Sequence, residues 1–125
     1  MAHLIEKDQI EKYFVGDIGG LGVQSLSGLT PVWNTLEGVN AILTLSGNTT
    51  ITLINLIAGQ SGNLTVTNPS EIYTLTFAGY TNKISPAIWK VDNQPIVSGL
   101  TLRDCFSYYF DGVLLLWNGT NGYKP

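Results

Sequence analysis

The feature that most constrains this chain is an Asp-Gly pair between two apolar runs, within residues 104–119 (DCFSYYFDGVLLLWNG). An Asp-Gly step in such a setting is a strong signal for a β-hairpin with a two-residue loop, because a type I′ turn needs positive φ at both central positions. We therefore predict a turn at Asp111-Gly112. This turn would place Phe110 opposite Val113 and Trp117 opposite Phe106.

Strand alternation sorts the side chains of this hairpin into two faces. One face carries Phe106, Tyr108, Phe110, Val113, Leu115 and Trp117, and the other carries Cys105, Ser107, Tyr109, Leu114, Leu116 and Asn118. A sheet backed by solvent would alternate cleanly between apolar and polar residues, whereas apolar side chains occur here on both faces. We expect a hairpin core of Phe106, Tyr108, Phe110, Asp111, Gly112, Leu115 and Trp117. The second face would be covered by another sheet or by a neighbouring subunit.

Most of the remaining chain also has the pattern of short strands separated by turns. The expected strands are 39–45, 49–57, 63–67, 71–77, 87–91, 96–102, 104–110 and 113–118. Strands of this length, spaced by 8 to 12 residues and rich in Thr, Val and Ile, are typical of a sandwich or barrel. We predict an all-β fold, an antiparallel β-sandwich resembling a jelly roll. In residues 49–57 (TTITLINLI), apolar side chains are again expected on both faces.

The chain divides into three segments by composition. Residues 1–15 are expected to be a short arm, helical or extended, residues 16–38 a glycine-rich connector, and residues 39–125 the β-sandwich domain. The candidate assembly residues of the arm are Leu4, Ile5, Ile10, Tyr13 and Phe14. A helix this short is marginal in isolation, so the arm is either a frayed tail or a segment that a partner orders. The GGLG sequence in the connector lacks the strand-turn-helix context of a phosphate-binding loop.

Charged residues are scarce and unevenly distributed. They make up 12% of the chain, against about 25% in ordinary domains. Six lie near the start, namely Glu6, Lys7, Asp8, Glu11, Lys12 and Asp17. Between Ile18 and Ser70 the only charged residue is Glu37. Surfaces that lack charge are suited to packing against other protein, as in fibres and shells.

Several functional classes receive no support from the sequence. A net charge of −3 argues against nucleic-acid binding, which favours a basic patch. We expect no membrane span, because no apolar stretch approaches about 20 residues, and no signal peptide, because the first residues lack an apolar core. The single cysteine, Cys105, excludes an internal disulfide.

We expect no catalytic site, cofactor site or metal site. The only histidine, His3, lies in the arm, and the several His, Cys or carboxylate ligands that a metal requires do not cluster. Asp104 and Asp111 lie a strand apart, and one of them is used by the turn. A pair of glycosidase carboxylates stays open as an alternative, but no feature favours it.

The aromatic residues allow two interpretations. Trp33, Tyr80, Trp89, Tyr108, Tyr109 and Trp117 could form a platform for sugars, with Tyr80 and Trp89 as candidate receptor contacts. Alternatively, aromatic residues in alternating strands belong to the core or to an interface, which is the stronger interpretation. Three triplets, beginning at Asn48, Asn63 and Asn118, match the pattern of glycan acceptors. We interpret them as turn residues.

From about Asn63 onward the sequence resembles the C-terminal β-domains of bacteriophage appendage proteins, such as tail fibres, head fibres and decorations. The residues concerned are 63–67 (NLTVT), 73–77 (YTLTF), 104–112 (DCFSYYFDG) and the strand ending Leu116-Trp117-Asn118. The resemblance implies a non-enzymatic structural protein on the exterior of the capsid or tail of a virion. It also implies a homotrimer that contacts other virion proteins and sometimes binds a host surface glycan.

This chain lacks the repetitive shaft of a long fibre, which favours a head decoration or short fibre over a long tail fibre. In this hypothesis, the arm anchors the protein and the β-domain forms the trimer. A carbohydrate- or host-receptor-binding module is the alternative function, since a fold does not fix its function. A small enzyme is the third.

Overall fold

The protein is seen here as a computed structural model that describes residues 22–84, 89–90 and 94–124. These residues form strands and loops without any helix, so the all-β expectation is confirmed for the described part of the chain. The expected N-terminal arm lies outside it. The strands are β1 (Val23–Leu26), β2 (Val32–Asn34), β3 (Asn40–Thr44), β4 (Thr49–Ile54), β5 (Ser61–Thr67), β6 (Leu75–Ala78), β7 (Thr81–Ile84), β8 (Trp89–Lys90), β9 (Gln94–Pro95), β10 (Arg103–Phe110) and β11 (Leu114–Tyr123).

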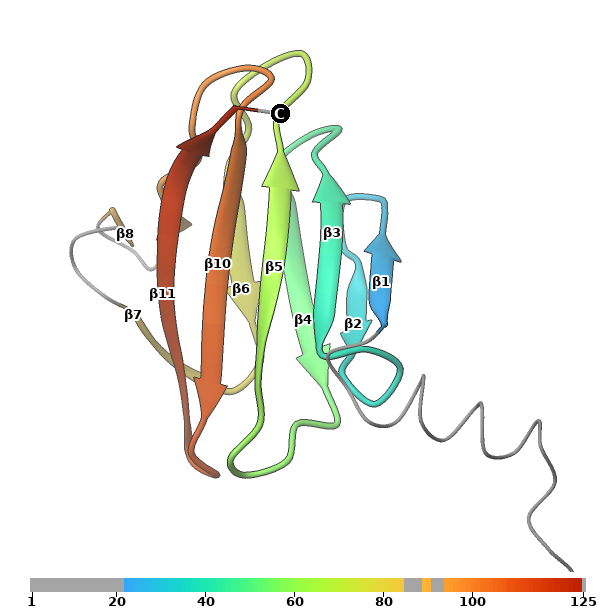
Figure 1. Ribbon diagram of the computed structural model, residues 1–125, viewed down its shortest axis with the longest axis vertical. Helices are drawn as coiled ribbons and strands as arrows, with labels where there is room; N and C mark the ends of the chain where they lie inside the picture. Colours follow the sequence, from blue (N-terminus) through green and yellow to red (C-terminus); the bar gives the residue numbers. More distant parts are fainter. Residues whose placement is uncertain (1–21, 85–88, 91–93, 125) are drawn as a thin grey trace, which may run out of the picture.

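Two sheets lie in two layers (Figure 1). The larger has six strands in the order β1-β3-β5-β10-β11-β7, and the smaller has three in the order β2-β4-β6. A short third sheet pairs β8 with β9. Alternate residues of the long strands point into the space between the layers, as in β4, where Thr49, Ile51 and Leu53 are buried. This two-residue period is the one that the sequence shows.

The first six strands alternate between the two sheets. Odd-numbered strands enter the larger sheet and even-numbered strands the smaller one, and all the pairs among them are parallel. The chain thus winds in successive coils, as in a parallel β-solenoid. The expected antiparallel arrangement is wrong for these strands. A jelly roll is built from antiparallel strands, so the order of β1 to β6 also differs from the jelly-roll expectation.

The hairpin of β10 and β11 extends the larger sheet beyond the last coil. β10 pairs antiparallel with both β5 and β11, and β7 pairs parallel with the far edge of β11. The larger sheet is therefore mixed, and β10 lies in its interior with a neighbour on each side. An interior strand has its backbone groups paired on both edges, which fixes its register and the direction of its side chains.

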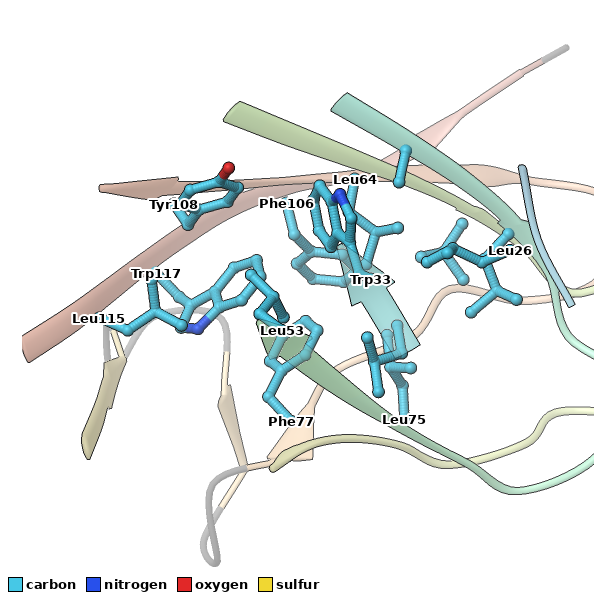
Figure 2. Packing of buried hydrophobic residues seen from close by; sticks show 14 of the residues in the cluster. Leu26, Trp33, Leu53, Leu64, Leu75, Phe77, Phe106, Tyr108, Leu115 and Trp117 are labelled. Atoms are coloured by element: carbon cyan, nitrogen blue, oxygen red, sulfur yellow. The ribbon is translucent and has the colours of Figure 1, made fainter. Parts of the chain in front are cut away.

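The core fills the space between the two sheets (Figure 2). Its buried residues are Leu26, Trp33, Ala41, Leu43, Leu45, Ile51, Leu53, Leu64, Val66, Leu75, Phe77, Phe106, Tyr108, Phe110, Leu115 and Trp117. Aromatic contacts connect the layers: the ring of Phe77 meets Phe106 edge-on, and Trp33 meets Tyr108 edge-on. Offset and edge-to-face ring contacts add to the burial of apolar area.

The described part of the segment expected to be a connector, residues 22–38, contains β1 and β2. β1 pairs with β3, and β2 pairs with β4. Trp33 of β2 is fully buried, and its indole N–H donates a hydrogen bond to the carbonyl of Gly38 at 2.8 Å. These contacts make residues 22–38 part of the β-domain. Sequence reasoning did not identify β1 and β2, because both strands are short and the segment is rich in glycine.

The β10–β11 hairpin differs from the predicted register by two residues. Phe110 pairs with Leu115 rather than with Val113, and Trp117 pairs with Tyr108 rather than with Phe106. Gly112 has φ of 104°, and neither Asp111 nor Val113 has positive φ. Gly112 therefore occupies the first central position of the turn, where a type II′ turn requires glycine.

The side chain of Asp111 explains this shift. Its Oδ1 accepts hydrogen bonds from the backbone N–H groups of Leu114 at 2.7 Å and Val113 at 2.8 Å. These two bonds hold the pKa of Asp111 below its ordinary value. A shift by two residues leaves every side chain on its predicted face. Val113 is the exception, because it lies in the turn and is 74% exposed.

Other strand boundaries also differ from expectation. β4 ends at Ile54, so Leu56 and Ile57 lie beyond it and the strand lacks the second apolar face expected of it. Residues 96–102 form a loop instead of a strand. The buried carboxylate of Asp104 orders this loop by accepting a hydrogen bond from the N–H of Ser98 at 2.7 Å, while its other oxygen accepts from Gly122 at 2.9 Å.

Candidate interaction face on the six-stranded sheet

The surface of the larger sheet that points away from the core is the candidate functional site. We call it the outer face, defined by the side chains that alternate with the buried ones on β3, β5, β10 and β11. It comprises Asn40, Ile42, Thr44, Ser61, Asn63, Thr65, Thr67, Arg103, Cys105, Ser107, Tyr109, Leu114, Leu116, Asn118 and Thr120. Strand pairing arranges these residues in rows that cross the strands.

One row places two large apolar side chains next to each other. Tyr109 on β10 pairs with Leu116 on β11, and they are 47% and 38% exposed. Ser61 flanks the pair on one side and Lys83 on the other. The predicted second apolar face of the hairpin therefore exists, and the described residues leave it open to solvent. The pair lies beside the hairpin turn, and adjoining exposed apolar side chains of this kind are a feature of interaction surfaces.

The neighbouring row is polar and uncharged. We call it the amide row, and it consists of Asn40, Asn63, Ser107 and Asn118, one from each of β3, β5, β10 and β11. Oδ1 of Asn40 accepts a hydrogen bond from the backbone N–H of Asn63 at 3.1 Å. The hydroxyl of Ser107 donates to Oδ1 of Asn63 at 2.6 Å, and Oδ1 of Asn118 accepts from the N–H of Gly119 at 2.9 Å.

Two open depressions lie beside this row. The larger, of about 440 Å³, is lined by Val39, Asn40, Ser61, Gly62, Asn63, Ser107 and Tyr108. The smaller, of about 230 Å³, is lined by Ser107, Tyr108, Tyr109, Leu116, Trp117 and Asn118. They share Ser107 and Tyr108, so one depression lies on each side of β10.

The larger depression depends on a close approach of backbone atoms at Gly62. A Cβ at this position would overlap the carbonyl oxygen of Val39 and crowd the ring of Tyr108. That ring is anchored below the depression, because its hydroxyl donates to the carbonyl of Val39 at 3.3 Å and accepts from Nε2 of Gln60 at 3.1 Å. Burial raises the pKa of Tyr108 to about 12, against the smaller lowering effect of the Gln60 bond.

Charge is sparse on the outer face. Arg103 lies near one end, in the row of Thr67 and Tyr123, and Lys83 lies at the edge strand β7. Cys105 is partly exposed, and burial raises the pKa of its thiol, so the neutral form predominates at pH 7. Among the described residues, no group of three or more His, Cys, Asp or Glu side chains could hold a metal ion. No helix within the described ranges could cross a membrane.

Tyr80, one of the two residues proposed from sequence as receptor contacts, lies away from the outer face. Tyr80 is 39% exposed, its ring packs edge-on against Phe110, and its hydroxyl accepts a hydrogen bond from the N–H of Leu56 at 3.3 Å. Trp89 forms β8 and pairs with Pro95, but its ring lies outside the described part of the structure. Receptor binding by these two residues stays a prediction. The arm residues Leu4, Ile5, Ile10, Tyr13 and Phe14 also lie outside the described residues.

Sequence reasoning interpreted the triplets at Asn63 and Asn118 as turn residues, although it also placed both positions in the expected strands 63–67 and 113–118. Both residues lie within strands, in β5 and β11. Only Asn48 lies between strands, where its Oδ1 accepts a hydrogen bond from the N–H of Thr74 at 3.0 Å. The amide row itself was missed because the alignment of four residues in one row depends on strand order and register.

No protein-family model, curated protein or solved structure matches this chain. The geometry of the outer face is therefore the basis for the functional argument that follows.

Proposed function

We infer that this chain is a non-enzymatic structural protein of a bacteriophage virion, a head decoration or short fibre on the particle's exterior. Its β-domain, a two-layer β-sandwich in the broad sense, assembles as a homotrimer through the part of the outer face that carries Tyr109 and Leu116. Residues 1–15 anchor it to other virion proteins. The observation that carries the self-assembly is the exposed Tyr109–Leu116 pair, which lies beside the hairpin turn on a sheet face with few charges.

Physical chemistry favours burial of this pair against a second copy of the chain. Full burial of a completely exposed large apolar side chain contributes about 1.5–3 kcal/mol. Tyr109 and Leu116 are 47% and 38% exposed, so each contributes part of that amount, and a trimer repeats the contribution at every contact. Few charged groups lie near the pair, which limits the cost of desolvating charge when a partner covers it. The scarcity of charge between residues 18 and 70 extends this character beyond the hairpin.

A charge placed on the outer face tests this proposal. We expect Leu116→Lys to lower the solution mass of the protein, because a lysine facing a partner would have to be desolvated. Val113→Lys is the matched control, since Val113 is more exposed than Leu116 but lies in the turn. Multi-angle light scattering measures the mass, and circular dichroism checks that both variants fold. An unchanged oligomer for Leu116→Lys contradicts this contact.

The virion assignment needs a separate test. Antibodies raised against the chain should label the outside of purified phage particles in immunogold electron microscopy. Labelling that occurs only in lysates and not on particles contradicts the assignment.

A further inference from the structure

The amides of Asn40 and Asn63 are held with their donor groups available to a ligand. Oδ1 of Asn40 accepts from a backbone N–H, which fixes the orientation of this amide because a backbone N–H can only donate. Oδ1 of Asn63 accepts from the hydroxyl of Ser107. Neither Nδ2 group donates a hydrogen bond to any of the described residues. Both can therefore donate to a molecule lying over β3 and β5.

Acceptors and hydroxyls surround these two donors in the larger depression. Ser61 and Ser107 supply hydroxyl groups, and Val39 supplies a backbone carbonyl that already receives a long hydrogen bond from Tyr108. None of the residues that line the depression carries a charge. Its volume of about 440 Å³ falls within the range of small-molecule sites, about 300–1,000 Å³.

The polar groups are positioned by paired strands rather than by a loop. Asn63 lies in β5 between β3 and β10, and it is directly opposite Ser107 in the antiparallel ladder. Adjacent strands are separated by about 4.7–4.9 Å, so the polar groups form a regular array across the sheet. A rigid array loses little conformational entropy when a ligand binds.

We propose that this depression binds a neutral glycan. Sugar hydroxyls both donate and accept, so they match a surface that presents amide donors, a carbonyl acceptor and serine hydroxyls side by side. An anionic ligand would lack a cationic partner here, and a cationic ligand would lack a carboxylate. The glycan lies across β3, β5 and β10, with the amides of Asn40 and Asn63 donating to its oxygens.

This site adjoins the proposed subunit contact but does not include the Tyr109–Leu116 pair. The Tyr109–Leu116 pair lies over β10 and β11, whereas the depression extends from β10 toward β5 and β3. A monomer would therefore keep the glycan site, and a trimer would present three copies of it. Loss of glycan binding and loss of assembly are distinguishable, because the first leaves the solution mass unchanged.

The test is titration calorimetry and saturation-transfer NMR on the full chain with neutral hexasaccharides. The panel consists of cellohexaose, maltohexaose, laminarihexaose and chitohexaose, with a heparin hexasaccharide and a Gly-Ser peptide as probes of other chemistry. The variant is Asn40→Ala combined with Asn63→Ala. Thr44→Ala is the matched control, because Thr44 is exposed on the same face of β3 but lies away from the depression.

We expect at least one neutral hexasaccharide to bind the wild-type chain. The double variant should raise its Kd by about tenfold or more, which is about 1.4 kcal/mol, while Thr44→Ala and the solution mass stay unchanged. The proposal is overturned if no neutral hexasaccharide binds, or if the double variant binds as the wild type does. Preferential binding of the heparin fragment or of the peptide also overturns it.

Discussion

The indole of Trp117 stacks face to face on the ring of Phe77, with ring centroids 3.8 Å apart and planes inclined by 2°. Trp117 belongs to β11 of the larger sheet and Phe77 to β6 of the smaller one, so this contact joins the two layers (Figure 2). The indole N–H also donates to Oδ1 of Asn82 on β7 at 3.1 Å. Trp117 thus connects the hairpin to the last coil and to the edge strand.

Replacing Trp117 with alanine should destabilise the domain severely. Trp117 is 3% exposed, and truncation of a buried tryptophan to alanine costs about 3–5 kcal/mol. That is a large share of the roughly 5–15 kcal/mol by which domains are stable. Urea unfolding followed by circular dichroism measures the loss. Val113→Ala is the control and should change stability by less than about 0.5 kcal/mol. Equal urea concentrations at the unfolding midpoint for the two variants would contradict the burial of Trp117.

A β-branched residue at Gly112 should destabilise the hairpin through its backbone. Gly112 has φ of 104°, and a Cβ there would lie 3.2 Å from Cβ of Ala58. Strain of this kind costs about 1–3 kcal/mol, so Gly112→Val should lower the Tm. Gly99 serves as the matched position, because a Cβ there meets nothing within 4 Å and its φ is not positive. If Gly99→Val lowers the Tm as much as Gly112→Val does, the turn geometry described here is wrong.

Stability should fall at alkaline pH in part because of Tyr108. Burial raises the pKa of its phenol from 10.0 to about 12, so the folded state retains this proton over a range in which the unfolded chain loses it. The stabilisation is fully present below pH 10 and is lost as pH rises through about 12. One proton contributes at most about 1.4 kcal/mol per pH unit.

The comparison with Tyr108→Phe isolates this contribution. Phenylalanine removes the titrating group together with the hydrogen bonds to Val39 and Gln60. The variant should be less stable at neutral pH, but its free energy of unfolding should decline less steeply between pH 10 and 12. Urea unfolding at several pH values gives both slopes. If the free energy of unfolding falls with pH equally steeply for the variant and the wild type, Tyr108 titrates in the folded state as it does in the unfolded one.

Deleting residues 1–15 should separate folding from attachment. The described residues between Leu26 and Trp117 already form a buried core cluster, so we expect the truncated chain to melt within a few degrees of the full chain. We also expect it to be missing from assembled particles, as judged by immunoblotting of purified virions. Incorporation at the normal level would show that the arm is only a tail, and failure to fold would show that it belongs to the core.

The faces of the hairpin were predictable from sequence, whereas its register was not. Alternation alone places Phe106 and Tyr108 inside and Ser107 and Tyr109 outside, and the structure has this arrangement. The register depends on the carboxylate of Asp111, which bonds two N–H groups beyond Gly112. A dipeptide pattern cannot distinguish this turn from a type I′ turn.

The parallel winding of β1 to β6 was not predictable, because it arises from contacts between distant segments. β3 pairs with β5 rather than with β4, which follows it in the chain. A short strand with alternating burial has the same local pattern in both arrangements. The amide row was missed for the same reason, since Asn40, Asn63 and Asn118 become neighbours only once the strand order is known.

The solution mass of the intact chain tests the central claim of self-assembly most directly. Sedimentation equilibrium at micromolar concentration should give a mass of about 41 kDa, corresponding to three chains of 13.6 kDa. The Tyr109–Leu116 pair would then have its partner in a second copy of the chain. A stable species of 13.6 kDa under the same conditions would contradict the account.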